Sequence, residues 1–129
     1  MRLPMRSEWI IASGGNELVG RYPWDEADMV SESLKRILRR ANVLESDIGH
    51  TTPVNTYTLG ASPFGVMDMA GNVWEWQANF RNGENSKLEL RGGSWDTIFD
   101  FARVAVPYYA FPDARIDDIG FRVLALSSD

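Results

Sequence analysis

The most informative stretch of this sequence covers residues 68–76 and reads Asp68-Met69-Ala70-Gly71-Asn72-Val73-Trp74-Glu75-Trp76. Its last four residues combine a β-branched side chain with two tryptophans, a composition typical of a β-strand. Residues 88–90 predict a second strand, and the polar residues 81–86 between the two predict a turn. The stretch therefore predicts two strands joined by a polar turn.

Helices are predicted on the N-terminal side of this stretch. A short helix follows Pro4 and ends at Gly14-Gly15, where glycine permits a left-handed turn. A longer helix is predicted over residues 26–41, because apolar residues recur there at helical spacing. Residues 42–65 have no period and many turn-forming residues, so they predict a long ordered loop. Residues 121–126 predict a final strand.

The composition limits the class of protein. With 129 residues, of which 44% are hydrophobic, the chain is predicted to form one domain over residues 1–129. Eleven glycines and six prolines favour a loop-rich α+β fold over a helical bundle. The net charge of -5 argues against binding to nucleic acid. Four basic residues in the longer helix are interpreted as a solvated face, with nucleic-acid binding as the alternative: Lys35, Arg36, Arg39 and Arg40.

Missing residue types exclude several kinds of chemistry. The chain has no cysteine, which rules out disulfides, thiolate metal sites and cysteine nucleophiles. His50 is the single histidine, so a metal site with two histidines is excluded as well. No apolar run is long enough to span a bilayer, and no charged-then-apolar signal leads the chain. The sequence therefore predicts no membrane span and leaves the localisation open.

Six motifs occur along the chain in a fixed order. Besides residues 68–76 they are Arg2-Leu3-Pro4 with Glu8-Trp9, Tyr22-Pro23-Trp24, Pro63-Phe64-Gly65, Leu90-Arg91-Gly92-Gly93-Ser94-Trp95 and Ile119-Gly120-Phe121-Arg122. In this order they closely resemble the sulfatase-modifying-factor domain, which is the domain of formylglycine-generating enzymes. The resemblance implies an α+β fold of the C-type-lectin-like kind, with a small twisted antiparallel sheet, two helices and long ordered loops.

The chain departs from this family in a way that bears on activity. The enzymes of the family use cysteines to bind copper and to attack substrate, and this chain has none. We therefore expect it not to be an enzyme. The chain also begins at the Arg-Leu-Pro motif of the family, so the part that precedes this motif in full-length family domains is not in this sequence.

A further departure lies in residues 91–122. Related bacterial domains carry many asparagines between their Gly-Gly-Ser-Trp and Gly-Phe-Arg motifs. This sequence aligns with that pattern without a gap, but another residue stands at each asparagine position: Asp96, Thr97, Ile98, Phe101, Val106, Tyr108, Tyr109, Ala110, Phe111, Ala114, Ile116, Asp117 and Asp118. Changes at the two adenines of an AAC codon can give every one of these replacements. Met, Trp, Gln, Lys and Glu, which that route cannot give, are absent. Residues 91–122 thus resemble the variable region of a target protein of a diversity-generating retroelement.

The physical character of this segment also favours binding. Five aromatic residues lie in it without strand alternation or helical spacing: Phe99, Phe101, Tyr108, Tyr109 and Phe111. Such rings are expected to be partly exposed, and Tyr and Phe give a large contact area for few rotatable bonds. We therefore predict that the thirteen positions bind a ligand, which we expect to be a protein surface and not a sugar. The alternative is that the rings complete the core, an alternative that is strongest for Phe99 and Phe101.

A metal site is also implied by the resemblance. In formylglycine-generating enzymes the block that matches residues 68–76 wraps a calcium ion. Carried over to this chain, Asp68 and Glu75 would supply side-chain oxygens, and Gly71 and Val73 would supply backbone carbonyls, as calcium prefers. Calcium is therefore a candidate cofactor. The alternative is that Glu75 bonds to backbone amides and Asp68 caps a turn without a metal.

Three functions follow from this reasoning. The first is a non-enzymatic variable protein, diversified by a retroelement, that displays its variable side chains on a lectin-like scaffold. The second is an oxidase of the formylglycine-generating kind or a related sulfatase-modifying enzyme, which copper-dependent oxidation of a cysteine-containing sulfatase peptide would favour. The third is an accessory domain of a larger assembly, against which a stable monomer in size-exclusion chromatography would count.

Overall fold

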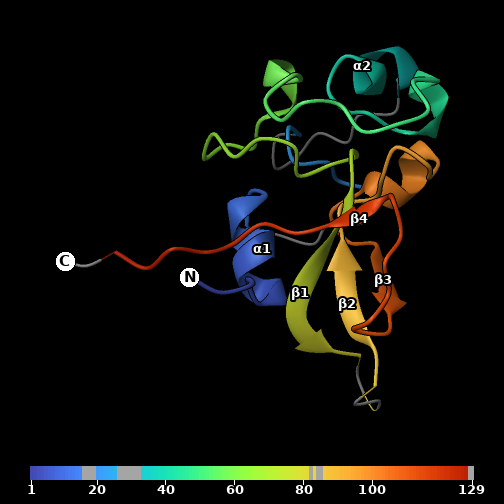
Figure 1. The fold of residues 1–129 in the computed structure, drawn as a ribbon. Coiled ribbons are helices and arrows are strands. Elements are labelled where there is room, and N and C mark those ends of the chain that lie inside the picture. Colours follow the sequence, from blue (N-terminus) through green and yellow to red (C-terminus); the bar gives the residue numbers. More distant parts are fainter. Residues whose placement is uncertain (16–19, 26–32, 82, 84–85, 128–129) are drawn as a thin grey trace.

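A four-stranded sheet lies at the centre of the structure, a computed structural model that describes residues 1–15, 20–25, 33–81, 83 and 86–127 (Figure 1). Its strands are β1 (Trp74–Phe80), β2 (Leu88–Arg91), β3 (Pro107–Ala110) and β4 (Ile119–Gly120), in the order β3-β2-β1-β4. β2 runs antiparallel to both β1 and β3, whereas β4 runs parallel to β1. The α+β class is confirmed, but the sheet is mixed and not wholly antiparallel as expected.

The first helix, α1 (Arg6–Ala12), packs beside β1 (Figure 1). Its residues Trp9 and Ile10 are buried, so this helix covers one face of the sheet. Glu8 accepts hydrogen bonds from the backbone N–H of Met5 and from the guanidinium of Arg2. The bonds from Arg2, and then the one from Met5, lower the pKa of Glu8 to about 2. The short helix predicted after Pro4 is therefore confirmed.

The second helix, α2 (Leu34–Leu38), occupies only part of the predicted range 26–41. Residues 26–32 lie outside the described part of the chain. The described helix ends at Leu38, because the N–H groups of Arg40 and Ala41 both donate to the carbonyl of Ile37 in a tightened last turn. Ile37 and Ala41 are buried, as the spacing predicted, while Leu34 is 40% exposed.

The long loop predicted over residues 42–65 is confirmed as irregular and ordered. It contains only two short 3-10 helices, η1 (Leu44–Ser46) and η2 (Thr58–Gly60). Together with α2 it gathers at one end of the sheet (Figure 1). Gly71 fixes this loop against the strands, because a Cβ there would lie 2.4 Å from the carbonyl oxygen of Asn42 and its φ is +75°.

The core of the described residues includes two clusters of buried side chains. One contains Trp9, Ile10, Met69 and Val104. The other contains Tyr22, Ile37, Ala41, Val43, Ala70 and Ala102. The sequence predicts core positions for Trp74, Trp76 and Trp95. Trp74 is buried, whereas Trp76 and Trp95 are half-buried.

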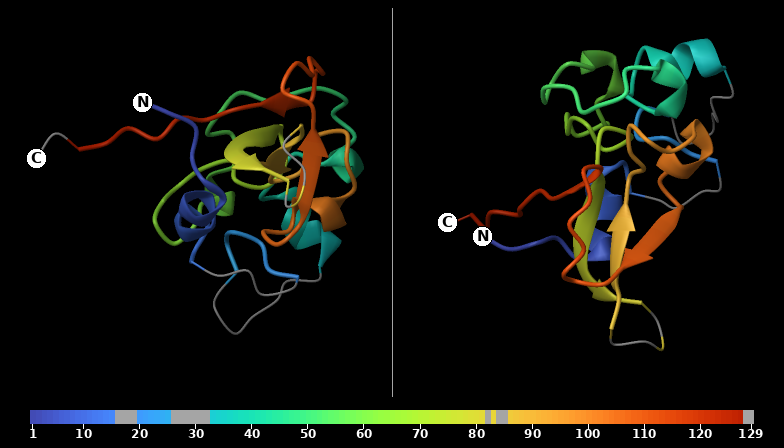
Figure 2. Two further views of the ribbon diagram at one scale, coloured as in Figure 1. Left: turned by 90° about the horizontal axis from the view of Figure 1, so that it is seen from below. Right: turned by 45° about the vertical axis from the view of Figure 1, so that its right-hand side comes forward.

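Two sequence expectations about strands are wrong. Residues 121–126 form no strand, and their described pairing is a single bridge between Leu124 and Arg2. The stretch lies beside the N-terminal segment, and both ends of the chain leave the molecule on the same side (Figure 2). Conversely, residues 107–110 form β3 although the variable segment shows no strand alternation. Pro107 opens this strand at an edge of the sheet, where a missing N–H donor is tolerated.

Candidate functional site

A hollow of about 410 Å³ opens between β3, β4 and the turn that follows β2. The short 3-10 helix η3 (Phe99–Ala102) and the strand β3 both contribute residues to its lining. Seven of the thirteen predicted binding residues line it: Asp96, Thr97, Phe101, Val106, Tyr108, Ile116 and Asp118. Trp74, Pro107 and Ile119 complete the lining. The structure therefore brings about half of the predicted positions around one cavity.

The floor of this hollow is set by the register of the sheet. Tyr108 pairs with Leu90 of β2, and Leu90 pairs with Trp76 of β1. Because side chains alternate along a strand, these residues and Trp74 share one face of the sheet. The rings of Trp74 and Tyr108 stack at a centroid distance of 5.3 Å. A buried tryptophan thus supports a half-exposed tyrosine from below.

Hydrogen bonds fix the wall beside this floor. The hydroxyl of Ser94, which is fully buried, donates to Oδ2 of Asp118 at 2.7 Å. The same hydroxyl accepts the N–H of Asp96 at 3.1 Å, and the N–H of Ser94 donates to the hydroxyl of Thr97 at 2.9 Å. The N–H of Trp74 donates to the carbonyl of Asp118 at 2.8 Å. Asp96, Thr97 and Asp118 therefore have fixed backbones and lie within one small network.

Contacts with the long loop hold the η3 side of the hollow. The carboxylate of Glu45 accepts the N–H of Phe99, and the N–H of Leu44 donates to the carbonyl of Thr97. Phe99 packs against the core cluster around Tyr22, and the hydroxyl of Tyr22 donates to its carbonyl. The interpretation of Phe99 as a core residue is therefore favoured. The next ring, Phe101, points outward and is 47% exposed.

Several large apolar side chains at and near the hollow are about half exposed. Tyr108 is 49% exposed and Ile116 is 52% exposed, and outside the hollow Phe111 is 54% exposed. Single exposed apolar residues are ordinary, but several around one cavity mark an interaction surface. The arrangement can bind by burying apolar and aromatic area.

The remaining predicted residues do not line this hollow. Tyr109 pairs with Glu89 and therefore lies on the opposite face of the sheet from Tyr108, beneath the guanidinium of Arg81 at 4.9 Å. Phe111 lies against the amino group of Lys87 at 5.0 Å. Ile98 and Asp117 are exposed and Ala110 and Ala114 are half-buried, and none of these four positions lines the hollow. Strand alternation turns Tyr109 away from the hollow, so the thirteen positions do not all share one face.

Sequence reasoning missed the contribution of Trp74. The sequence predicts a core residue there, and Trp74 is only 4% exposed, yet its ring forms the floor under Tyr108. The available signal is the alternation of Trp74 and Trp76 along a strand, which predicts that both lie on one face. Their contact with Tyr108 could not be predicted without the position of β3.

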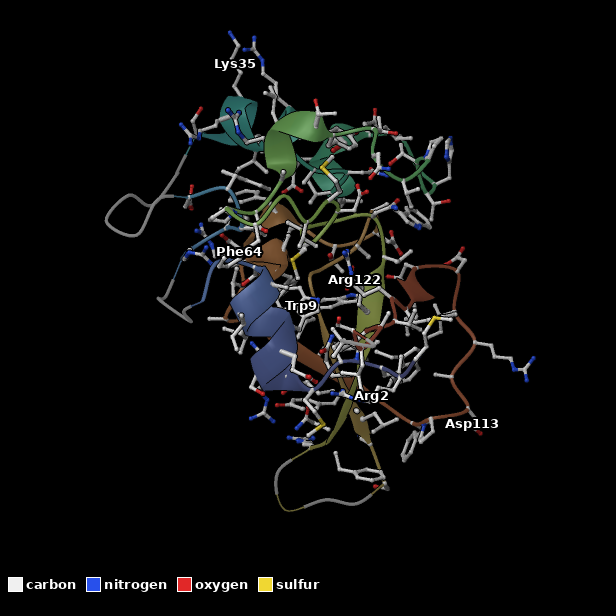
Figure 3. All side chains as sticks on the ribbon, turned by 90° about the vertical axis from the view of Figure 1, so that its left-hand side faces the viewer. Arg2, Trp9, Lys35, Phe64, Asp113 and Arg122 are labelled. Carbon is white, nitrogen blue, oxygen red and sulfur yellow. The ribbon has the colours of Figure 1, made fainter. Side chains whose placement is uncertain are left out.

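A second hollow of about 410 Å³ lies at the candidate calcium block. Its lining includes Asp68, Val73 and Glu75 from the block, and Arg122 from the segment after β4. Figure 3 shows Trp9 of α1 and Arg122 pointing into the same region beside β1. The contacts of Asp68 and Glu75 in this hollow therefore show whether the predicted ligands fit a calcium ion.

The carboxylate of Glu75 is already fully engaged. Its Oε1 accepts from the guanidinium of Arg122 at 2.6 Å, and its Oε2 accepts from Arg122 at 2.8 Å and from the indole N–H of Trp9 at 2.9 Å. Arg122 also donates to the carbonyls of Met67 and Asp68. Burial alone would lower the pKa of Arg122, but the hydrogen bonds and charge of Glu75 outweigh it and raise that pKa.

These contacts do not fit calcium binding through Glu75. Calcium takes six to eight oxygens, and here the one buried carboxylate and the carbonyl of Asp68 face a guanidinium instead. Oδ2 of Asp68 accepts the N–H of Asn55 at 2.8 Å, as expected of a turn-capping aspartate. Within the described ranges no three His, Cys, Asp or Glu side chains gather as a metal site would require. Arg122 thus supplies the positive charge that the resemblance assigns to a metal.

The sequence predicts that Arg103, Arg115 and Arg122 are frame residues that pair with Asp100 or Asp113, and the structure treats them differently. Arg115 is exposed. Arg103 does pair with Asp100, at 3.0 Å, and also donates to the carbonyl of Gly20. Arg122 pairs with Glu75 instead of an aspartate.

Comparison with known proteins identifies the class of this domain. The model of the family described as the sulfatase-modifying factor enzyme 1-like domain matches residues 1–126, so the chain belongs to that family. The serine/threonine-protein kinase Pkn1 of Chlamydia trachomatis is 36% identical over 138 residues, which cover 94% of this chain and 20% of the kinase. The inactive C-alpha-formylglycine-generating enzyme 2 of Bos taurus is 30% identical over 129 residues, covering 94% of this chain and 42% of that protein.

A solved structure is similar over nearly the whole chain. Variable protein 1 of Treponema denticola superposes with a TM-score of 0.71 and is 26% identical, covering 93% of this chain and 45% of that chain. This chain spans less than half the length of each of the three proteins. No helix among the described residues is long and apolar enough to cross a membrane.

Proposed function

We propose that this chain, over residues 1–129, is a ligand-binding variable domain and not an enzyme, with residues 91–122 as its variable region. The observation that carries the proposal is the hollow over β3, because seven of the thirteen positions with a retroelement-like substitution pattern line it. The ligand is a protein surface, since half-exposed rings beside fixed polar groups resemble the centre of a protein interface. The main contacts come from the seven positions that line the hollow: Asp96, Thr97, Phe101, Val106, Tyr108, Ile116 and Asp118. The other six positions vary outside it, with Tyr109 on the opposite face of the sheet.

The similarity to a protein named as a variable protein supports this proposal. So does the chemistry of the chain: without cysteine it has no thiol to bind copper or attack a peptide. One relative is named as an inactive formylglycine-generating enzyme, which is consistent with a family member that is not an enzyme. The proposed mechanism is display, in which the hydrogen-bonded backbone around Ser94 stays fixed while side chains around it change.

A selection experiment tests the display mechanism. The thirteen positions are randomised together with NNC codons, which reproduce changes at both adenines of AAC, and the library is selected for binding to one folded protein such as hen lysozyme. We expect folded binders whose sequences differ from this chain only at those positions. A matched library randomises thirteen exposed positions in residues 44–64 and should yield fewer folded binders. Failure of the first library to fold or to bind would contradict the proposal.

The retroelement itself is tested in DNA. The genome that encodes this chain should hold a near-identical repeat of the segment for residues 91–122 that differs at adenines, next to a reverse transcriptase. A genome with neither would contradict diversification and would leave a fixed binding domain. The enzyme alternative predicts copper-dependent conversion of a cysteine-containing sulfatase peptide, and we expect none.

A further inference from the structure

We propose that the hollow over β3 takes a cationic side chain, an arginine or a lysine, from the partner protein. This inference rests on the proposed function and names the chemistry of its ligand. It follows from the charge of the variable positions, from the rings that face the hollow and from the size of the cavity.

The variable positions carry an excess of negative charge. Among the thirteen, three are aspartate and none is basic. Changes at the adenines of AAC give histidine by one substitution, as they give aspartate, and arginine by two, so the genetic route does not exclude basic residues at these positions. Two of the three aspartates, Asp96 and Asp118, line the hollow, and none of its described lining residues is basic. The cavity is therefore complementary to a positive charge.

Both carboxylates are held where such a charge would meet them. Oδ2 of Asp118 accepts the hydroxyl of Ser94, which leaves the group oriented at the wall. Asp96 is exposed, and its N–H is bound to the same hydroxyl. The nearby cation Arg103 is already paired with Asp100 and with the carbonyl of Gly20. A partner cation therefore meets oriented carboxylates with no described arginine paired to them.

Aromatic rings provide the second part of the site. Phe101 and Tyr108 are each about half exposed at the hollow, and Tyr108 is held in place by stacking on Trp74. A cation over the face of such a ring is attracted by its quadrupole, and desolvation strengthens the attraction. Elsewhere this chain places its own cations over rings: Arg81 over Tyr109, Lys87 over Phe111 and Arg103 over Tyr22.

The size of the cavity selects one side chain. A volume of about 410 Å³ holds an arginine or lysine side chain but not a folded element. A single side chain inserted at the centre of an interface is how hot spots are built, and arginine is frequent among them. The partner therefore presents a protruding basic residue, and the outer positions such as Ile98 surround it.

Short peptides test this inference. The probes are acetylated and amidated pentapeptides Gly-Ser-Xaa-Ser-Gly in which Xaa is Arg, Lys, Leu or Glu, added at up to about 10 mM to isotope-labelled protein. We expect the Arg and Lys peptides to shift the NMR signals of the Trp74 indole and the Tyr108 amide, and the Leu and Glu peptides to leave them unchanged. Asp96→Asn should weaken binding of the Arg peptide about threefold. The control Asp113→Asn, an exposed carboxylate outside the hollow, should leave it unchanged.

The outcomes separate this inference from the proposed function. Equal or tighter binding of the Leu peptide overturns the cationic ligand and leaves the binding surface in place. Absence of any shift with all four peptides also overturns it, and so does an Asp96→Asn variant that binds the Arg peptide as well as the unchanged protein. Failure of the library selection described above overturns the proposed function, whichever peptide binds.

Discussion

Two hollows of about the same size, near 410 Å³ each, lie on this molecule, and their polar groups are used differently. In the hollow at the candidate calcium block, the carboxylate of Glu75 is 5% exposed and bound to Arg122 and Trp9. In the hollow over β3, Phe101 and Tyr108 are about half exposed, and Asp96 lies open to solvent. In the first hollow the polar groups bind one another and stabilise the fold. In the second hollow the rings and the carboxylate of Asp96 remain exposed, so that a ligand can contact them.

The comparison teaches which positions a domain of this kind can vary. Buried polar groups that satisfy each other cannot change singly, because each partner left behind keeps its desolvation cost. Half-exposed rings next to a hydrogen-bonded backbone can be replaced, because substitutions at the surface usually change the free energy of unfolding little. Substitutions in the two hollows test this difference, from the largest expected effect to the smallest.

The largest expected effect comes from Arg122→Met. The substitution leaves the buried carboxylate of Glu75 without its cation, and breaking such a pair costs about 3 kcal/mol or more. Chemical denaturation followed by tryptophan fluorescence measures it. The control is Arg2→Met, which breaks the exposed pair between Arg2 and Glu8 and should hardly move the midpoint. Equal losses in both variants would contradict a special role for the buried pair.

The next effect comes from Gly71→Ala in the block beside the same hollow. The new Cβ would lie 2.4 Å from the carbonyl oxygen of Asn42, so the loop must shift in addition to the strain of a φ of +75°. We expect a loss of about 2–3 kcal/mol. Gly49→Ala is matched, because Gly49 has a φ of +79° and a Cβ added there would meet nothing within 4 Å. If the two variants lose the same free energy of unfolding, the close approach of residue 71 to Asn42 does not contribute to the loss, and the expectation is wrong.

A smaller effect is expected from Tyr108→Ala in the open hollow. The ring stacks on Trp74 but is 49% exposed, so its removal should cost about 1 kcal/mol. Thermal unfolding gives the value, and Phe111→Ala, a ring outside the hollow, should cost less. A loss above about 3 kcal/mol for Tyr108→Ala would place this ring in the core.

The smallest effect is expected from removing divalent cations. Because Arg122 occupies the carboxylate of Glu75, a chelator should leave the melting temperature unchanged, and added calcium should not raise it. A protein that binds a metal in its folded state is stabilised increasingly as the concentration of that metal rises. Stabilisation by calcium would show that Arg122 gives way to the ion and would restore the interpretation of Asp68, Gly71, Val73 and Glu75 as ligands.

Much of the scaffold could be predicted from the sequence, because it rests on local patterns and ordered motifs. The strand at Trp74 has aromatic and β-branched residues, and the helix before Ser13 has an early acidic residue and a glycine end. The strand over residues 107–110 was not predicted. Proline is unusual in strands, and the pairing of this segment with β2 depends on the tertiary structure. The strand predicted over residues 121–126 does not form, because these residues pair with no neighbouring strand and make one bridge, between Leu124 and Arg2.

The candidate site was predictable as a segment but not as a shape. The substitution pattern of residues 96–118 pointed to the variable positions, yet it could not show that Tyr109 turns to the opposite face. Nor could the contact between Glu75 and Arg122 be predicted from sequence, because the two residues lie 47 positions apart along the chain. In both cases the missing information was the register of a strand with its neighbour.

The most direct test of the open hollow as a variable surface removes its large side chains together. A chain carrying Phe101→Ser, Tyr108→Ser and Ile116→Ser should fold and unfold cooperatively, with a melting temperature lowered by less than about 10 °C. Circular dichroism during heating measures it. A fall of more than about 20 °C, or the loss of a cooperative transition, would show that these side chains hold the fold and would contradict their role as a freely variable binding surface.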